Sequence, residues 1–330
     1  MPVFLCFEDC LLPLRTRIYI DGYNLYYGCL TKTPYKWLDV LALFETGILP
    51  TILYQSARGR SGAAMELLHE PAIKYFTADI IETAAKGQDS VSSQAHYHNA
   101  LTKKLGRRIA FVKGNYSIYK AKQPLISADA PERKPRECEK VQVWKFEEKQ
   151  SDVNIALHMF DDALQGKVDQ VVLVTNDTDL VPAFQMLEAR CPNVVRGLVV
   201  PTRKPSKDKA VERHANASLT KLADWVRRYI TDEELQRAQL PDVVVATAGG
   251  RASKKPVSWY ARPDHLMKLI AKAKPVLGGE GRIMKWAREP NQWLNDQKPI
   301  DLIETDEGAA LVFAYIDKYI KDQIKDSTTI

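Results

Sequence analysis

The sequence predicts an α/β sandwich around a central, mostly parallel sheet, followed by a small, mainly α-helical domain. Two observations predict the sandwich: strand-like runs alternate with helical patterns up to about residue 230, and the run VDQVVLVTND is nearly continuously apolar and β-branched. Such a run is typical of a strand buried on both faces of a parallel sheet. A third observation predicts the helical domain, because the chain beyond Pro256 carries helical patterns without a strong strand.

Hydropathy patterns define the elements of the sandwich in order. RIYID (17–21) is a strand, a helical stretch follows at 36–44, and PTILYQS (50–56) is the next strand, which gives β-α-β order. The patterns then predict helices at 63–76 and 94–105, a strand or hairpin arm at 108–120, a loop at a hairpin tip at 127–140, a strand at 141–147, a helix at 151–164, the buried strand at 168–177, a helix at 180–190, a strand at 194–200 and a closing helix at 218–229.

Two features of the predicted helix at 151–164 are open to a direct test. Ser151 is a natural N-cap residue. Apolar residues at helical spacing predict the buried face of this helix, namely Val153, Ala156, Leu157, Phe160 and Leu164.

A change in composition sets the domain boundaries. The stretch TAGGRASKKP, which ends at Pro256, has the small and basic residues of a linker. We therefore expect a first domain over 1–230, a linker over 231–256 and a helical domain over 257–330.

Composition and charge limit the classes of protein to which this chain could belong. The 330 residues are 45% hydrophobic, enough for one large core or two moderate ones, so disorder is not expected. A formal net charge of +6 is compatible with a polyanionic partner. The five cysteines form no CxxC pair, which favours a reducing cytoplasm over a disulfide framework. The start of the chain lacks a basic n-region and is expected to be a strand or loop against the core, and no apolar run is long enough to predict a transmembrane helix.

Acidic residues follow two predicted strands at their carboxyl ends. Asp21 ends the first strand, and Asp177 and Asp179 come directly after VVLVT. Because the carboxyl ends of parallel strands share one edge, where ligands bind, we expect these side chains to lie close together. Asp152, in the first turn of its helix, joins them if that helix begins at the same edge.

A group of carboxylates such as this favours a divalent metal site. Two carboxylates about 4 Å apart repel each other by about 4 kcal/mol at an effective dielectric constant of about 20, and a bound cation removes that cost. Oxygen ligands without a convergent His or Cys favour Mg²⁺ or Mn²⁺ over zinc. Such ions polarise a phosphodiester and generate hydroxide from bound water, the chemistry of metal-dependent nucleases. Taken singly, each aspartate is more often a helix cap or a turn residue.

Three sequence blocks resemble the signature blocks of NYN domains and occur in the same order. They are IYIDGYNLYYG (18–28), EKQSDVNIALHMFDDAL (148–164) and VVLVTNDTDLVPAF (171–184). With the elements around them they cover roughly residues 16–230. The resemblance implies a PIN-like fold, a Mg²⁺-dependent ribonuclease activity and an acidic site formed here by Asp21, Asp152, Asp177 and Asp179.

Other polar residues of these blocks are candidates for supporting roles. Asn24 would orient a metal-bound water or a phosphate oxygen, with an ordinary turn residue as an equal alternative. Lys149 is a candidate for neutralising a phosphate, although a solvated lysine is the default interpretation. Thr175 and Asn176 are candidates for contacts to the metal shell or the substrate. His158 stands where many NYN relatives carry an aspartate and is predicted to be a partly buried structural histidine, while Asp161 and Asp162 are predicted to form a solvated face.

Basic and aromatic residues are candidates for holding RNA. The two basic clusters are Lys103, Lys104, Arg107 and Arg108, and Arg203, Lys204, Lys207 and Lys209. Either cluster would track a phosphate backbone, although such charge runs are more often simply solvated surface. Tyr23, Tyr26 and Tyr27 flank the predicted site and are candidates for stacking on unpaired bases, with a core role expected for at least one of them.

The segment from Val276 to Tyr319 resembles the Xre/MbcA/ParS type of toxin-binding domain. The matching positions are Trp286, Pro290, Asn291, Leu294, Pro299, Leu302, Gly308 and Val312. Asn295 and Asp296 depart from the pattern, because the family usually has glycine there. The resemblance implies a module that docks a partner protein or self-associates, and the alternative is a helical domain whose Trp and Leu residues are merely its core.

These observations leave three functions to compare. The first is a metal-dependent ribonuclease that uses Mg²⁺ or Mn²⁺, with a tail that binds a protein partner in a toxin-antitoxin, stress or phage-defence setting. The second is a regulatory module that binds RNA or metal without turnover. The third is a small-molecule oxidoreductase, an assignment that some NYN relatives carry. It gains no support from the sequence, since no GxGxxG follows a strand and no residue set suggests flavin, haem or iron.

Overall fold

The computed structural model describes residues 12–54, 64–85, 87–204, 214–246 and 250–328. The chain divides into two compact units, Met1–Lys254 and Lys255–Ile330. The expected strand or loop at the start of the chain lies outside the described residues, as do Lys207 and Lys209.

A seven-stranded parallel sheet forms the centre of the first unit, which confirms the expected α/β class. Its order is β4-β3-β1-β7-β8-β9, with β2 beside β1. In the middle of the sheet, Ile20 pairs with Tyr75 on one side and with Val174 on the other. The strands are β1 (Leu14–Asp21), β2 (Met65–Leu67), β3 (Ile73–Thr77), β4 (Ile109–Lys113), β7 (Gln170–Val174), β8 (Val195–Val199) and β9 (Trp225–Arg227).

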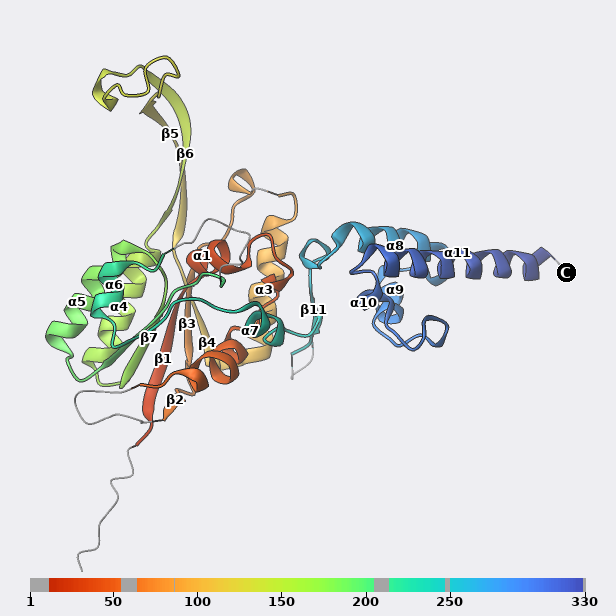
Figure 1. Cartoon of the computed structure of the whole chain (residues 1–330), viewed down its shortest axis with the longest axis horizontal. Helices are drawn as coiled ribbons and strands as arrows, with labels where there is room; N and C mark the ends of the chain where they lie inside the picture. The colour runs from red at the N-terminus through yellow and green to blue at the C-terminus, as the bar shows by residue number, and fades with distance from the viewer. Residues whose placement is uncertain (1–11, 55–63, 86, 205–213, 247–249, 329–330) are drawn as a thin grey trace, which may run out of the picture. The chain divides into compact units, whose positions relative to one another are not determined.

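Helices cover both faces of this sheet (Figure 1). On one face lie α4 (Ser151–Leu164), α5 (Val181–Arg190) and α6 (Ala217–Leu222); on the other lie α3 (Ser90–Leu105) and α7 (Asp232–Arg237). The short helices α1 (Gly22–Leu25) and α2 (Val40–Ala42) continue into π-helical segments at Tyr26–Leu30 and Leu43–Ile48. Single 3-10 turns occur at Pro34–Lys36, Leu49–Thr51, Glu82–Ala84, Gly106–Arg108, Pro135–Glu137 and Thr178–Leu180.

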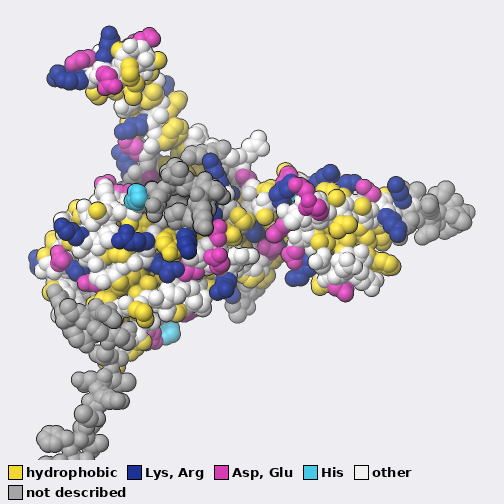
Figure 2. Space-filling view, viewed as in Figure 1, with side chains coloured by type: hydrophobic (Ala, Val, Ile, Leu, Met, Phe, Trp, Pro, Cys, Tyr) yellow, Lys and Arg dark blue, Asp and Glu magenta, His cyan; other side chains and the backbone are white. Residues whose placement is uncertain are grey.

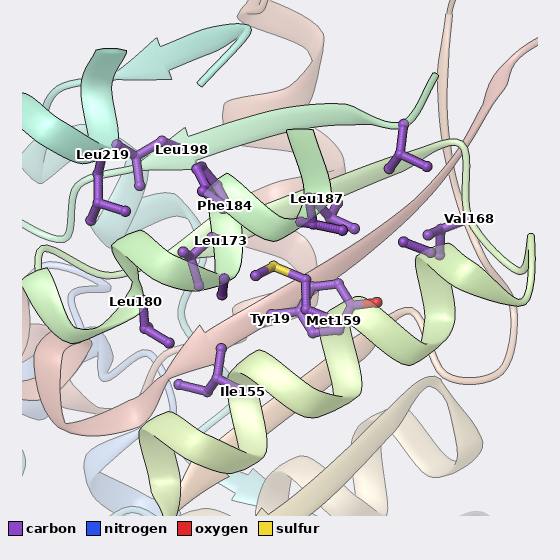
Figure 3. Packing of buried hydrophobic residues seen from close by; sticks show 14 of the residues in the cluster. Tyr19, Ile155, Met159, Val168, Leu173, Leu180, Phe184, Leu187, Leu198 and Leu219 are labelled. Atoms are coloured by element: carbon purple, nitrogen blue, oxygen red, sulfur yellow. The ribbon is translucent and has the colours of Figure 1, made fainter. Parts of the chain in front are cut away.

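One hydrophobic core lies between the sheet and the helices α4 and α5 (Figure 3). Leu173 from β7 packs with Met159 from α4 and Phe184 from α5, and all three are fully buried. Burying one such side chain stabilises the fold by about 1.5–3 kcal/mol relative to leaving it in water. This packing fixes the start of α4 at the edge of the sheet where β1 and β7 end.

The buried face of α4 matches the one expected from its apolar spacing only in part, because Ala156 and Phe160 pack against the core and are partly buried. Ile155 and Met159 face the sheet, whereas Val153, Leu157 and Leu164 are exposed. Both rows recur at helical spacing, so periodicity alone does not distinguish them.

Three further expectations about the first unit are wrong in part. The helix expected at 63–76 is replaced by β2 and β3, and the described part of the strand expected at 50–56 is a 3-10 turn followed by irregular chain. The closing helix expected at 218–229 is α6 followed by β9. In each case a short apolar run fits either type of element, and pairing with a neighbouring strand decides which one forms.

A long hairpin leaves the sheet at the end of β4. β5 (Asn115–Pro124) and β6 (Lys140–Lys149) pair antiparallel over their full length and project away from the sheet (Figure 1). The polar insert at 127–140 lies at the hairpin tip, as expected. At its base, Gly114 leaves no room for a side chain, because a Cβ there would lie 2.4 Å from the carbonyl oxygen of Lys149.

The segment expected to be a linker, 231–256, is largely part of the first unit. Leu235 of α7 and Leu240 are buried, and a capping box between Thr231 and Glu234 begins the helix. The pair β10 (Val243–Val244) and β11 (Ser253–Lys254) follows, and Ser253 accepts a hydrogen bond from Lys103 of α3. The unit boundary at Lys254/Lys255 therefore replaces the boundary expected at residue 230.

The second unit is helical, as expected. Its helices are α8 (Pro263–Leu277), α9 (Glu280–Ala287), α10 (Pro299–Leu302) and α11 (Asp306–Thr328). Leu269, Ile283 and Val312 are fully buried in its core. Across the described parts of both units, no helix combines the length and the apolarity that a membrane span requires.

Candidate functional site

The expected aspartates gather at one edge of the sheet. Asp21 is the last residue of β1, and Asp177 follows the neighbouring strand β7 by three residues. Asp152 lies in the first turn of α4, which begins at the same edge. Burial raises the pKa of Asp152 to about 6, and repulsion from Asp21, Asp177 and Asp179 contributes to that rise. The side chains are therefore close enough to sense one another's charge.

Asp21 is the most enclosed of the group, with 5% of its surface exposed. Its Oδ1 accepts a hydrogen bond from the backbone N–H of Asn24 at 3.0 Å. Its Oδ2 accepts bonds from Asn24 Nδ2 at 2.6 Å and Thr175 Oγ at 2.9 Å. Burial nevertheless raises the pKa of Asp21, and the Asp177 charge adds to that effect. Asn24 and Thr175 thus hold and orient this carboxylate.

Asp177 and Asp179 form the turn that follows β7. Oδ1 of Asp177 accepts the backbone N–H of Asp179 at 3.0 Å, which caps the 3-10 turn Thr178–Leu180. The backbone N–H of Asp177 donates to Thr175 Oγ at 3.2 Å, so Thr175 connects this turn to Asp21. Capping uses one oxygen of Asp177, and Asp179 is exposed at the edge.

A fifth carboxylate, Glu148 at the end of β6, belongs to the same group. Burial raises its pKa to about 7, with repulsion from Asp21 and Asp152 adding to the rise. Ser151 donates its hydroxyl to Glu148, so this serine is the first residue of α4 rather than its N-cap, a position held by Gln150 with φ of 79°. The block EKQSD contains Glu148, but only the path of the hairpin brings its side chain to this edge.

The group carries uncompensated negative charge. Within the described residues, no Lys, Arg or His forms an ion pair with Asp21, Glu148 or Asp152. Oxygen-only donors in this state fit a hard divalent cation such as Mg²⁺ or Mn²⁺. In the conformation described here, no set of three or more His, Cys, Asp or Glu side chains among the described residues is arranged to hold a metal ion.

The raised pKa values predict a pH-dependent stability. Because the folded pKa values of Asp152 and Glu148 lie above the ordinary 3.8 and 4.5, the folded state binds protons more tightly than the unfolded state. The stabilisation is therefore complete below about pH 4 and is lost as the pH rises through about 6 to 7. In EDTA we expect Asp152→Asn to raise the melting temperature at about pH 8 but not at about pH 3, where the Asp152 carboxyl is protonated in both the folded and the unfolded state.

Thermal denaturation at the two pH values measures this difference. Asp161→Asn, on an exposed position of the same helix, is the matched control and should change neither melting temperature. An equal gain for Asp152→Asn at both pH values would contradict the repulsion argument.

The remaining polar candidates near the site have structural partners. Asn176 uses both atoms of its amide on the backbone of another segment, donating to His214 O at 2.9 Å and accepting from Asn216 N at 2.7 Å. Lys149 Nζ lies 3.0 Å from Glu147, and the side chain is about half exposed. Asn176 therefore positions the segment before α6, and Lys149 lies on the rim of the site.

The basic residues Lys103 and Arg107 lie away from the acidic edge. Lys103 lies in the last turn of α3 and Arg107 in the 3-10 turn that follows, close to the start of β4 and so at the opposite edge of the sheet. Lys103 Nζ donates to Arg251 O at 2.6 Å, and Arg107 Nη1 pairs with Glu70 at 3.1 Å. The expected contact of these two residues with substrate at the acidic edge does not fit this placement.

Tyrosines line the approach to the carboxylates. Tyr23 stacks on Tyr27 with ring centroids 6.2 Å apart and meets Tyr116 of the hairpin edge-on at 5.9 Å. Tyr23 Oη also donates to Ala78 O at 3.1 Å, which gives this residue a structural role. Tyr27 is exposed, and its ring also meets that of Tyr26 edge-on with centroids 5.1 Å apart.

One acidic residue of α4 was expected to be solvated and is instead buried. Asp162 Oδ2 accepts from Tyr19 Oη at 2.7 Å and lies 2.8 Å from Arg17 Nη1 and 2.6 Å from Lys74 Nζ. His158 lies 3.3 Å from the same Lys74 Nζ and has a structural position, as expected. Asp161 is exposed, also as expected.

Comparison with known proteins identifies both parts of the chain. The family model of the NYN domain matches residues 15–221, and the model of the antitoxin Xre/MbcA/ParS C-terminal toxin-binding domain matches residues 272–319. Both resemblances expected from the motifs are confirmed.

Individual relatives were also found. The 6-hydroxy-3-succinoylpyridine 3-monooxygenase HspA of Pseudomonas putida is 49% identical over 311 residues, which cover 94% of this chain and 96% of that protein. A crystal structure of a protein of unknown function from Vibrio parahaemolyticus aligns with a TM-score of 0.35 and 17% identity, covering 67% of this chain and 95% of that one.

Proposed function

The chain belongs to the NYN-domain family, and from this premise we propose that it is a hydrolase that cleaves RNA phosphodiester bonds with Mg²⁺ or Mn²⁺. One observation carries the proposal: carboxylates from β1, α4, the β7 turn and β6 gather at a single edge of the sheet, where burial and the neighbouring negative charges raise the pKa values of Asp21, Asp152 and Glu148. Maintaining such repulsion costs stability. A fold that keeps this arrangement points to a function that uses the charge.

The residues of the site have different roles in the proposed reaction. Asp21, Asp152, Asp177 and Asp179 would hold the metal, which when bound supplies a Lewis acid and an activated water for phosphodiester hydrolysis. Asn24 and Thr175 hold the Asp21 carboxylate in one orientation. Glu148, with a pKa of about 7, is suited to accept a proton near neutral pH.

A direct experiment tests the hydrolase proposal. The purified protein is incubated with Mn²⁺ and mixed RNAs, and the products are separated on a gel. Products that disappear in EDTA support hydrolysis. Metal-dependent RNA binding without products would instead favour a regulatory module.

The second unit is proposed to be an interaction module. Its matched toxin-binding segment suggests docking of a protein partner or self-association, in a toxin-antitoxin, stress or phage-defence setting. Because the unit boundary lies at Lys254/Lys255, removing residues 255–330 is expected to leave RNA cleavage unchanged within about twofold while altering partner capture or assembly state. Light scattering and affinity capture measure the second effect. A truncated protein identical to the full chain in both would refute the interaction role.

A second candidate function is oxygenation of a hydroxylated pyridine. The observation in its favour is the 49% identity to the Pseudomonas monooxygenase over nearly the whole chain. The test offers 6-hydroxy-3-succinoylpyridine, O₂ and a reduced nicotinamide or flavin, and follows the products by mass spectrometry. An oxygenated product, together with intact RNA in the Mn²⁺ experiment, would replace the hydrolase proposal.

A further inference from the structure

One face of the β5–β6 hairpin carries a row of aromatic and lysine side chains that the proposed hydrolysis does not use. Directly paired residues of antiparallel strands point to the same face, and alternate pairs share it. The alternate pairs on this face are Tyr116 with Glu148, Ile118 with Phe146, Lys120 with Trp144, and Lys122 with Gln142. We call the residues Tyr116, Lys120, Lys122, Trp144 and Phe146 the hairpin track.

The large side chains of the track are open to solvent. Trp144 is 60% exposed and Phe146 is 50% exposed. Lys120 Nζ lies 5.2 Å from the Trp144 ring centroid, so an ammonium group stands directly beside an accessible indole. Figure 2 shows hydrophobic side chains interleaved with Lys and Arg along the hairpin. Folding of the hairpin alone does not account for aromatic rings left in water.

The opposite face of the hairpin is different in charge. There Glu147 forms ion pairs with both Lys145 and Lys149. On the track, by contrast, no carboxylate of the described residues pairs with Lys120 or Lys122. The positive charge of the track is therefore available to an anionic ligand, whereas Glu147 neutralises part of the positive charge on the other face.

The track is continuous with the acidic edge. Its innermost residue, Tyr116, is paired with Glu148 and contacts Tyr23 beside Asp21. Trp144 lies four residues from Glu148 along β6, about 13 Å at the rise of a β-strand. A chain that enters the carboxylate site can thus extend outward over the track.

We propose that the hairpin track binds single-stranded RNA, with bases stacked on Trp144 and Phe146 and phosphates near Lys120 and Lys122. Interleaved aromatic rings and unpaired cations complement unpaired bases and the phosphate backbone between them. An apolar protein surface would leave the lysines without a matching charge. The inference rests on the proposed function, since that function identifies RNA as the polymer, and it adds that the bound RNA is single-stranded.

Binding is tested with the full chain and fluorescein-labelled poly(U), by anisotropy in EDTA so that turnover does not interfere. The double variant Trp144→Ala/Phe146→Ala is expected to raise the dissociation constant by about tenfold or more. Lys120→Ala/Lys122→Ala is expected to lower the slope of log affinity against log salt by about 1.4. The matched control is Tyr119→Ala/Lys145→Ala, a second ring and ammonium pair on the opposite face, with Nζ 5.9 Å from the ring centroid. It should change the dissociation constant by less than about twofold.

The outcomes separate this inference from the hydrolase proposal. The proposal for the hairpin track is overturned if the track and control variants weaken RNA binding equally, or if neither weakens it. This holds even if Mn²⁺-dependent cleavage is found. Track-dependent binding without cleavage supports the track and counts against hydrolysis. Far-UV circular dichroism of each variant checks that the hairpin still forms. Binding to a poly(A)·poly(U) duplex is measured as well. If the track variants lose as much affinity for the duplex as for poly(U), the track does not recognise unpaired bases.

Discussion

Replacing Asp152 with Asn is expected to lower the rate of RNA cleavage by about a thousandfold or more, because removing one carboxylate from a metal site costs several kcal/mol of transition-state stabilisation. Asn keeps the size of the side chain but removes the charge that the other carboxylates sense. Asp179→Asn and addition of EDTA should have the same effect. The fold is expected to remain, since Asp152 is only partly buried at the helix start.

The rate is measured on radiolabelled single-stranded RNA with saturating Mn²⁺, and isothermal titration calorimetry reports metal binding to the same samples. Asp161→Asn is the matched control, since it makes the identical chemical change on an exposed position of α4. We expect its rate to stay within about twofold of the wild-type rate. Full activity of Asp152→Asn, or activity that survives EDTA, would rule out the metal-dependent mechanism.

The acidic edge was predictable because its residues depend on strand order alone. Asp21 follows an apolar run, and Asp177 and Asp179 follow a β-branched one, so parallel pairing of β1 and β7 is sufficient to bring them together. Asp152 required one further condition, that its helix begin at the same edge. That condition holds because α4 packs antiparallel to β1 through Ile155 and Met159.

Other residues escaped prediction because tertiary packing decides their environment. Glu148 follows Glu147 in an alternating strand, so the two carboxylates lie on opposite faces, and only the path of the hairpin shows which face meets the site. Asp162 follows Asp161 directly in the sequence, yet one is buried and the other exposed. α4 has apolar residues on two sides, so the sequence did not reveal which side faces the sheet. Short apolar runs at β2 and β3 fit helix or strand equally well.

The second large effect is expected from Asp162, which is 1% exposed and neutralises buried cations. Its carboxylate lies within 2.8 Å of Arg17 and within 2.6 Å of Lys74. Burial alone would raise the pKa of Asp162, but the hydrogen bonds from Lys74, Tyr19 and Arg17 together lower it. The pKa of Lys74 is lowered, chiefly by burial, although the hydrogen bond to Asp162 and the Asp162 charge oppose that shift.

Asp162→Asn leaves Arg17 and Lys74 without their counter-charge, and breaking a buried pair in this way costs about 3–5 kcal/mol of unfolding free energy. Urea denaturation followed by circular dichroism measures the loss. The control is Glu70→Gln, which removes the partner of Arg107 from an exposed pair with side chains 83% and 54% accessible and should cost less than about 1 kcal/mol.

Because the folded pKa of Asp162 is lowered, its contribution to stability is present above its ordinary pKa of about 3.8 and is lost as the pH falls through the lower folded value. The difference between wild type and Asp162→Asn should therefore stay constant from neutral pH down to about pH 5 and shrink below about pH 4. A difference smaller than that of the surface control would mean that solvent reaches Arg17 and Lys74 once the carboxylate is gone.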